Sequence, residues 1–260
     1  MSHDLNNYLV FGERFVDKCG ELLKKHYQKN INVEIKSDGS FVTNIDKKIE
    51  NLFLKKIKEE FPNHGVLGEE FGHYNPNSKY LWVIDPLDGT HSFIAGKPLF
   101  GTLLSLIIDG IPSLGIIDMP ILDERWVGAK GVGVKKNKKK CSLIKCNKNL
   151  NECILSSTSL LMFDELQSKV IKKIYSKIRF PIFGTDCYAY GLLISGNVDI
   201  IIEANMKPWD FMAQNFLINE IGGFISDWSG NPLTIYSNGK VIAAKSKSAF
   251  KKALGFLKGI

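Results

Sequence analysis

The spacing of apolar residues over positions 1–62 predicts two helices. Apolar residues recur every three to four positions over 4–28 and again over 45–60, where Pro62 stops the pattern. Between these stretches Val33 and Ile35 alternate with polar neighbours, which predicts a short strand, and residues 37–40 predict a turn. This part of the chain is therefore expected to form a helix, a strand and a second helix.

Beyond Pro62 the pattern changes to short apolar runs. Residues 65–67 and 80–84 predict strands that each run into acidic residues, and residues 100–134 predict an antiparallel meander. The basic run at 135–140 contains no aromatic residue, so we expect a solvated hairpin tip or connection there rather than a nucleic-acid patch.

The second half of the chain alternates between the two patterns. The expected strands are 154–155, 180–183, 198–202, 224–227 and 241–244, and the expected helices are 163–177, 188–194, 211–221 and 247–257. Together the two halves predict a mixed α and β fold of two fused lobes, residues 1–147 and 148–260, with a mainly antiparallel sheet in the first lobe.

Composition narrows the class of protein. The 260 residues are 44% hydrophobic and 23% charged, which is typical of a globular protein and excludes a disordered chain. The formal charge of +7 favours an anionic partner, either a polymer or a small ligand. No apolar run reaches the roughly 18 residues of a membrane span, and no signal-peptide pattern is visible, so we expect a cytoplasmic protein without a membrane partner. The five cysteines form no C-x-x-C pair, which argues against a disulfide framework or a zinc ribbon.

The most informative stretch runs from Trp82 to Thr90. An apolar strand ends there in Asp85 and Asp88, and Glu69 and Glu70 close the preceding strand. One such Asp is usually a turn or helix cap. Several together are hard to explain in that way, because a buried carboxylate needs a cation or several hydrogen bonds. Carboxylates are the ligands that Mg²⁺ prefers, so this stretch predicts a magnesium site.

A further acidic residue, Asp210, stands in the second lobe before an apolar helix. Its position fits an N-cap and a metal ligand equally well. The five histidines have no zinc-ligand spacing such as H-E-x-x-H. The chain also lacks a G-x-S-x-G elbow, a Walker A loop and a G-x-G-x-x-G turn, so serine hydrolase, P-loop and dinucleotide-binding functions have no support.

These motifs resemble the signatures of the inositol monophosphatase superfamily of Mg²⁺-dependent phosphatases. The matching segments are Gly68-Glu69-Glu70, the stretch from Asp85 to Phe93, and Trp209-Asp210, and the resemblance extends to Gly222-Gly223. It implies a layered αβαβα sandwich, a homodimer, and hydrolysis of a small phosphate monoester by a metal-activated water.

The resemblance also implies the metal ligands. Glu69 and Asp85 match ligands of a first metal, together with the main-chain carbonyl of Leu87. Asp85, Asp88 and Asp210 match ligands of a second metal, with Asp85 bridging the two. Two or three Mg²⁺ ions are implied, with Mn²⁺ as a substitute and Li⁺ as an inhibitor.

Other positions match the remaining machinery. Asp46 matches the acidic residue that works with Thr90 on the nucleophilic water. If Gly89 and Thr90 begin a helix, their backbone N–H groups can bind phosphate oxygens. Glu70 matches a position that is usually not a direct ligand, and we assign no role to His91.

Two other classes compete with this interpretation. Haloacid-dehalogenase-like phosphatases use D-x-D-G-T, whereas two residues, Pro86 and Leu87, separate Asp85 from Asp88 here. A non-catalytic polyanion-binding protein would use the charge of +7, but it would not need the acidic residues as a set.

The substrate is expected to be read by the second lobe. The segment 184–191 resembles the histidinol-phosphatase branch, as do 93–102 and 124–126. Asp186 and Glu203 match positions that contact the leaving group, and two carboxylates there would attract a cationic substrate such as histidinol phosphate. Inositol 1-phosphate or another polyol or nucleotide phosphate is the alternative. Asp186 could instead cap the helix that begins near Tyr188.

Overall fold

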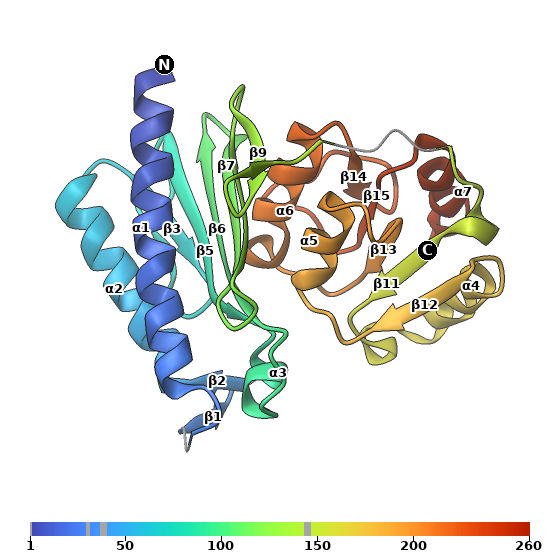
Figure 1. Ribbon diagram of the computed structural model, residues 1–260, viewed down its shortest axis with the longest axis horizontal. Helices are drawn as coiled ribbons and strands as arrows, with labels where there is room; N and C mark the ends of the chain where they lie inside the picture. Colours follow the sequence, from blue (N-terminus) through green and yellow to red (C-terminus); the bar gives the residue numbers. More distant parts are fainter. Residues whose placement is uncertain (1, 30–31, 37–40, 143–146) are drawn as a thin grey trace.

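Five layers of secondary structure are stacked in the computed structural model, which describes residues 2–29, 32–36, 41–142 and 147–260. From one side to the other these are a pair of helices, a sheet, a middle helical layer, a second sheet and an outer pair of helices (Figure 1). The expected αβαβα sandwich is confirmed. None of the helices in these ranges is long and apolar enough to cross a membrane.

The first layer consists of α1 (Ser2–His26) and α2 (Asn44–Glu60), which cover one face of the first sheet. Aromatic side chains lock the two helices together, with the rings of Phe15 and Phe53 4.7 Å apart. Between the helices β1 (Val33–Ile35) pairs antiparallel with β2 (Phe41–Thr43). The turn expected at 37–40 lies outside the described residues.

The first sheet has the strand order β10-β9-β8-β7-β6-β5-β3-β4. Within this sheet, only the β3–β5 pair is parallel among the described strands, so the expectation of a mainly antiparallel first sheet is confirmed. The basic run forms the tip of the β9–β10 hairpin. Of the two expectations for this run, a hairpin tip or a connection, the hairpin tip is confirmed. The bounds are β3 (Gly65–Gly68), β4 (Gly72–Tyr74), β5 (Tyr80–Asp88), β6 (Gly101–Ile108), β7 (Ile111–Met119), β8 (Glu124–Ala129), β9 (Gly133–Lys136) and β10 (Lys139–Lys140).

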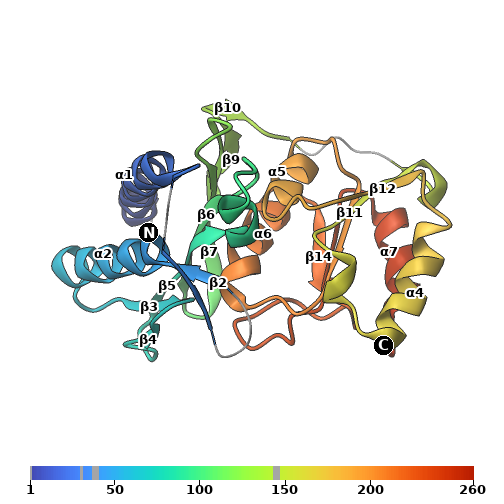
Figure 2. The same ribbon diagram turned by 90° about the horizontal axis from the view of Figure 1, so that it is seen from below.

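The middle layer contains α5 (Tyr188–Ile194) and α6 (Pro208–Glu220), which lie between the two sheets (Figure 2). Helix α6 approaches β7 so closely that a Cβ on Gly115 would stand 2.6 Å from the backbone oxygen of Ala213. The inner face of the first sheet is therefore covered by a helix from the second half of the chain. A short helix, α3 (Thr90–Ile94), follows β5.

The second sheet has the order β12-β11-β13-β15-β14 and is mixed, because β11 pairs parallel with both of its neighbours. Its outer face is covered by α4 (Glu165–Tyr175) and α7 (Lys247–Leu257), as Figure 2 shows. The strands are β11 (Ile154–Ser157), β12 (Phe180–Phe183), β13 (Ile200–Glu203), β14 (Phe224–Asp227) and β15 (Val241–Ala244), with single 3₁₀ turns η1 (Leu150–Glu152) and η2 (Leu160–Met162). Since the chain crosses from the first sheet to the second between β10 and β11, we propose to keep Asn147 as the boundary between the lobes.

One helix begins earlier than its apolar pattern predicts. Helix α6 starts at Pro208 rather than Phe211, because proline at the first helical position needs no N–H partner and has a helical φ. Asp210 therefore lies inside the first turn and is not the N-cap, so the N-cap interpretation is wrong.

Candidate active site

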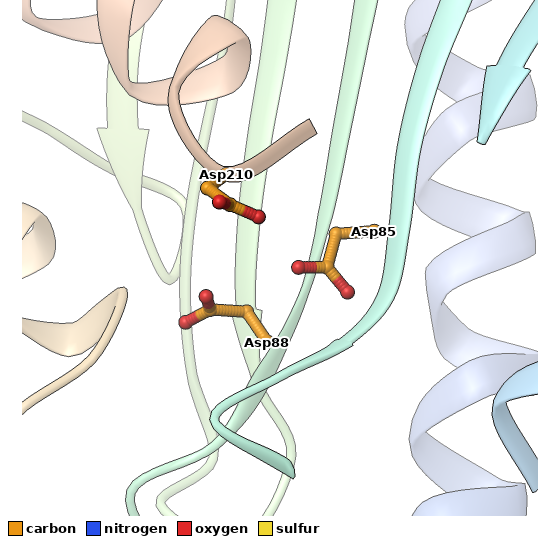
Figure 3. Close-up of side chains that lie close together, drawn as sticks. All are labelled: Asp85, Asp88 and Asp210. Carbon is orange, nitrogen blue, oxygen red and sulfur yellow. The ribbon is translucent and has the colours of Figure 1, made fainter. Parts of the chain in front are cut away.

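Two carboxylates of β5 and one of α6 meet at the end of β5. Asp85, Asp88 and Asp210 each offer one oxygen, and these oxygens all lie within 4.8 Å of one another (Figure 3). The pairing of β5 with β6 shifts between Asp85 and Asp88, which is a β-bulge. Residues three apart on a regular strand point to opposite faces, so the bulge allows both side chains to face α6.

Each of the three carboxylates is held by one backbone N–H group. Asp85 Oδ1 accepts a hydrogen bond from the N–H of Leu87 at 2.9 Å. Asp88 Oδ2 accepts from Cys187 at 2.7 Å, and Asp210 Oδ2 accepts from Lys207 at 2.6 Å. The other oxygens of Asp85 and Asp210 receive no hydrogen bond from the described residues and are available for a ligand.

The electrostatics of this cluster favour a bound cation. Burial raises the pKa of Asp85, and the charges of Glu69, Asp88 and Asp210 raise it further. Burial raises the pKa of Asp88 to about 7, with a further contribution from Asp186. Among the described residues no Lys or Arg forms an ion pair with the three clustered carboxylates. An all-oxygen donor set of this charge fits Mg²⁺.

Glu69, the remaining expected ligand, has another partner in the structure. Lys36 Nζ lies 2.7 Å from carboxylate oxygens of both Glu69 and Glu70. The structure therefore does not bring Glu69 into the cluster of the three aspartates, although its charge raises the pKa of Asp85. The turn after β3 is also held by Glu50, whose carboxylate accepts hydrogen bonds from the N–H groups of Glu70 and Phe71 at 2.8 and 2.9 Å.

Asp46 and Thr90 lie on separate elements and have separate partners. Asp46 Oδ2 accepts hydrogen bonds from the hydroxyl and the backbone N–H of Thr43, whereas the buried Oδ1 has no partner among the described residues. Burial raises the pKa of Asp46 to about 7, against the hydrogen bonds from Thr43. The Thr90 hydroxyl donates to the carbonyl of Leu87 at 3.0 Å. Within the described structure no hydrogen bond joins Asp46 to Thr90.

Gly89 turns the chain from β5 into α3. Its φ is +81°, and a Cβ at this position would stand 2.9 Å from the carbonyl oxygen of Leu99. Only glycine tolerates both conditions without strain. As expected, Gly89 and Thr90 stand at the start of a helix.

Asp186 and Glu203, the two residues expected to contact the substrate, accept hydrogen bonds from neutral donors. Asp186 Oδ2 accepts a hydrogen bond from the Ser92 hydroxyl on α3 at 2.8 Å, and its side chain makes no capping bond to α5, so the helix-cap interpretation is wrong. Glu203 Oε1 accepts bonds from the backbone N–H and the hydroxyl of Thr158, at 3.2 and 2.5 Å. Its Oε2 accepts from the Tyr190 hydroxyl at 2.8 Å.

A pocket of about 150 Å³ joins the aspartate cluster to these residues. Asp88 and Asp210 line one part of it, and Asp186 and Glu203 line another. Larger hollows of about 610 and 490 Å³ lie beside α1 and beside α6, and neither contains the cluster. We place the site at the smaller pocket, because it is there that the groups able to hold a metal and a substrate converge.

Sequence reasoning missed several residues around the site. Lys36 and Ser92 show no signal in the sequence, because their partners lie far away along the chain. Two others could have been found by helical spacing: Glu50 follows Asp46 by four residues on the buried face of α2, and Gln214 follows Asp210 by four on α6. Tyr190 was also missed, and its hydroxyl donates to Glu203.

Known proteins match the chain along nearly its whole length. Residues 4–257 match the model of the inositol monophosphatase family. The chain is 41% identical over 229 residues to the bifunctional phosphatase IMPL2, chloroplastic, of Arabidopsis thaliana, covering 87% of this chain and 66% of that protein, slightly under two thirds of its length. It is 29% identical over 244 residues to a histidinol-phosphatase of Chlorobaculum parvum, covering 94% and 93% of the two chains.

Solved structures agree with this assignment. An inositol monophosphatase from Zymomonas mobilis superimposes with a TM-score of 0.88 at 34% identity, over 97% of this chain and 98% of that one. The family match favours this family over the haloacid-dehalogenase-like class and over a non-catalytic polyanion-binding protein. The chain therefore belongs to the inositol monophosphatase family and is a phosphoric monoester hydrolase.

Proposed function

We propose that this phosphatase hydrolyses histidinol phosphate in a Mg²⁺-dependent reaction. The observation that carries the proposal is the placement of Asp186 and Glu203 in the same pocket as Asp88 and Asp210. A phosphate bound at the aspartate cluster would leave its alcohol portion near two further carboxylates. Histidinol phosphate carries an ammonium group and an imidazole, whereas inositol is an uncharged polyol that would leave these carboxylates without a cationic partner.

Asp85, Asp88 and Asp210 would hold the metal, with the Leu87 carbonyl and Glu69 as further proposed ligands. When bound, Mg²⁺ supplies positive charge that lowers the pKa of a water molecule and stabilises the leaving oxygen. For Glu69 to take part, its carboxylate would have to release Lys36, which holds it at 2.7 Å. The binding of two or three Mg²⁺ ions, their replacement by Mn²⁺ and inhibition by Li⁺ remain predictions.

The remaining residues would bind phosphate and move a proton. The backbone N–H groups at Gly89 and Thr90 would bind phosphate oxygens, since they stand at the start of α3. Asp46 Oδ1 is free to accept a hydrogen bond, and with the Thr90 hydroxyl it would take the proton of the attacking water. No protein nucleophile is needed. A homodimer and a cytoplasmic location remain predictions from the sequence.

A phosphate-release screen tests the substrate. The substrates to compare are histidinol phosphate, inositol 1-phosphate, fructose 1,6-bisphosphate and adenosine 3′,5′-bisphosphate. We expect the highest kcat/KM with histidinol phosphate, in line with the relatives named histidinol-phosphatase at 29% and 30% identity. A preference for inositol 1-phosphate would instead favour the alternative, for which the Zymomonas mobilis structure at 34% identity is the specific support.

A further inference from the structure

Gln214 is a buried amide to which no described residue is hydrogen-bonded. It lies on α6 one turn after Asp210, is 1% exposed and lines the 150 Å³ pocket of the site. Neither its Nε2 nor its Oε1 has a partner among the described residues. Leaving both ends of a buried amide unpaired is unfavourable, and an apolar side chain of similar size would avoid that penalty.

The neutral side chains of the pocket that could donate a hydrogen bond, other than Gln214, are engaged within the described structure or exposed. The hydroxyls of Thr158 and Tyr190 both donate to Glu203, so they are not free to donate to a ligand. Asn205 donates to the carbonyl of Met162 and is exposed. Gln214 is thus the buried side-chain donor that the described pocket leaves free.

The next residue on the same helix shows what a purely structural amide looks like. Asn215 is also buried, and its Nδ2 donates to the carbonyl of Leu233 at 3.3 Å. Its Oδ1 accepts a hydrogen bond from Asn219 at 2.9 Å. Asn215 does not line the pocket of the site. Of these two neighbouring amides, the one that lines the pocket is therefore the one without a partner in the described structure.

We infer that Gln214 is a specificity-determining residue, whose amide hydrogen-bonds a polar group on the alcohol portion of the substrate. An amide offers one acceptor and a pair of donors, so it suits a group that both donates and accepts, such as an imidazole ring or a hydroxyl. The inference rests on the proposed function only in placing the phosphate at the aspartate cluster. It holds for a polyol phosphate as well as for histidinol phosphate, and it excludes an apolar alcohol as the preferred leaving group.

The test compares Gln214→Leu with the matched control Asn215→Leu. The first readout is the ratio of kcat/KM for histidinol phosphate to kcat/KM for phenyl phosphate, which has no polar group on its ring. We expect Gln214→Leu to lower this ratio roughly tenfold, mainly through KM, because a site built to bond a polar group loses that preference when the bond is removed. Asn215→Leu should leave the ratio unchanged.

The second readout is the unfolding midpoint without substrate. Gln214→Leu should raise it by roughly 2 °C or more, because the variant removes an unpaired buried amide. Asn215→Leu should lower it, because the partners of Asn215 lose their bonds. A merely structural role for Gln214 predicts a lowered midpoint in both variants.

Several results would overturn the inference while leaving the proposed function intact. One is an unchanged ratio in Gln214→Leu. Another is an equal loss of kcat on both substrates, which would place Gln214 at the aspartate cluster instead. If the wild-type enzyme prefers inositol 1-phosphate, the proposed substrate fails, and the same ratio is measured with that ester; a tenfold fall there still supports the inference.

Discussion

At the scale of single residues, the carboxylates of the pocket differ in how many hydrogen bonds they already accept. Glu203 accepts three from Thr158 and Tyr190, whereas Asp186 accepts one from Ser92. Asp186 therefore keeps more acceptor capacity for a cationic substrate. Burial raises the pKa of Asp186, against the hydrogen bond from Ser92 and the positive charge of Lys97. A bound ammonium group would relieve that unfavourable burial.

Asp186→Ala should raise KM for histidinol phosphate by roughly ten- to a hundredfold, the effect of losing a hydrogen bond to a charged group. Steady-state kinetics with histidinol phosphate and inositol 1-phosphate measure it, and KM for the uncharged inositol ester should change less. Asp186→Asn is the matched variant, since it keeps an acceptor for Ser92 and removes the charge. If Asp186→Asn has the same KM for histidinol phosphate as the wild type, charge is not the basis of recognition.

Burial of His64 should make the free energy of unfolding depend on pH. Its Nδ1 accepts a hydrogen bond from the buried Trp82 indole at 3.1 Å, and its ring stacks on Tyr80 with centroids 4.6 Å apart. Burial lowers the pKa of His64 from 6.5 to about 4. At pH values between these two, His64 is protonated in the unfolded chain and neutral in the folded chain. The free energy of unfolding therefore falls as pH drops from 6.5 to about 4.

This contribution has an upper limit of roughly 3 kcal/mol. Urea unfolding of wild type and His64→Gln at several pH values isolates it, because other titrating groups cancel in the comparison. The difference in stability between the two proteins should shrink as pH falls through this window. A difference that stays constant with pH would show that His64 is protonated equally in both states.

At the scale of elements, α6 connects the fold to the site. It carries Asp210 and Gln214, and it is positioned by the glycine of β7 that lets the backbones approach. In Gly115→Ala the new Cβ would stand 2.6 Å from the Ala213 oxygen, which is backbone and cannot move without the helix. Displacing α6 would displace Asp210 from the aspartate cluster.

We expect Gly115→Ala to destabilise the protein by roughly 2 kcal/mol and to lower kcat at least about tenfold. Gly255→Ala is the control, because a Cβ there meets nothing within 4 Å on a regular helix, and it should stabilise by about 0.5–1 kcal/mol. Thermal unfolding and phosphate release measure both effects. Wild-type kcat in Gly115→Ala would show that α6 does not position the site.

The spacing of apolar residues and the turn residues predicted most helices and strands, because both depend only on positions that are close in sequence. It missed β4, which has three residues and is a strand only through its pairing with β3. It also missed the bulge after Asp85, since an extra residue in one strand shows only against the partner strand. The layered order came from the family resemblance, and the partners of Lys36 and Ser92 depend on contacts between segments that are distant in sequence.

At the scale of the whole molecule, the two sheets share the middle helical layer. One core cluster contains Leu103 and Trp126 from the first sheet together with Phe211 and Leu217 from α6. Residues 1–147 therefore lack the helix that covers the inner face of their own sheet. The proposed lobes are joined by a common core and depend on each other for stability.

Urea unfolding should thus be a single transition, with coincident midpoints by tryptophan fluorescence and far-UV circular dichroism. Trp126 lies in the shared core and Trp228 in the outer core. If the lobes unfolded separately, the fluorescence transition would therefore have two steps. A fragment of residues 1–147 should not fold alone. Two resolved transitions, or a folded fragment, would contradict this view.

If Asp85, Asp88 and Asp210 hold the metal on which phosphate release depends, the reaction needs both a free metal and the Asp85 carboxylate, and Asp85→Asn at saturating Mg²⁺ removes the second. Phosphate release from the best substrate should cease in excess chelator and return with Mg²⁺, and Asp85→Asn should lower kcat by at least about a thousandfold. The control Asp109→Asn alters an exposed aspartate paired with Lys79 and should keep wild-type kcat. Undiminished release in chelator, or a kcat for Asp85→Asn equal to that of the control, would show that the three aspartates hold no metal needed for the reaction.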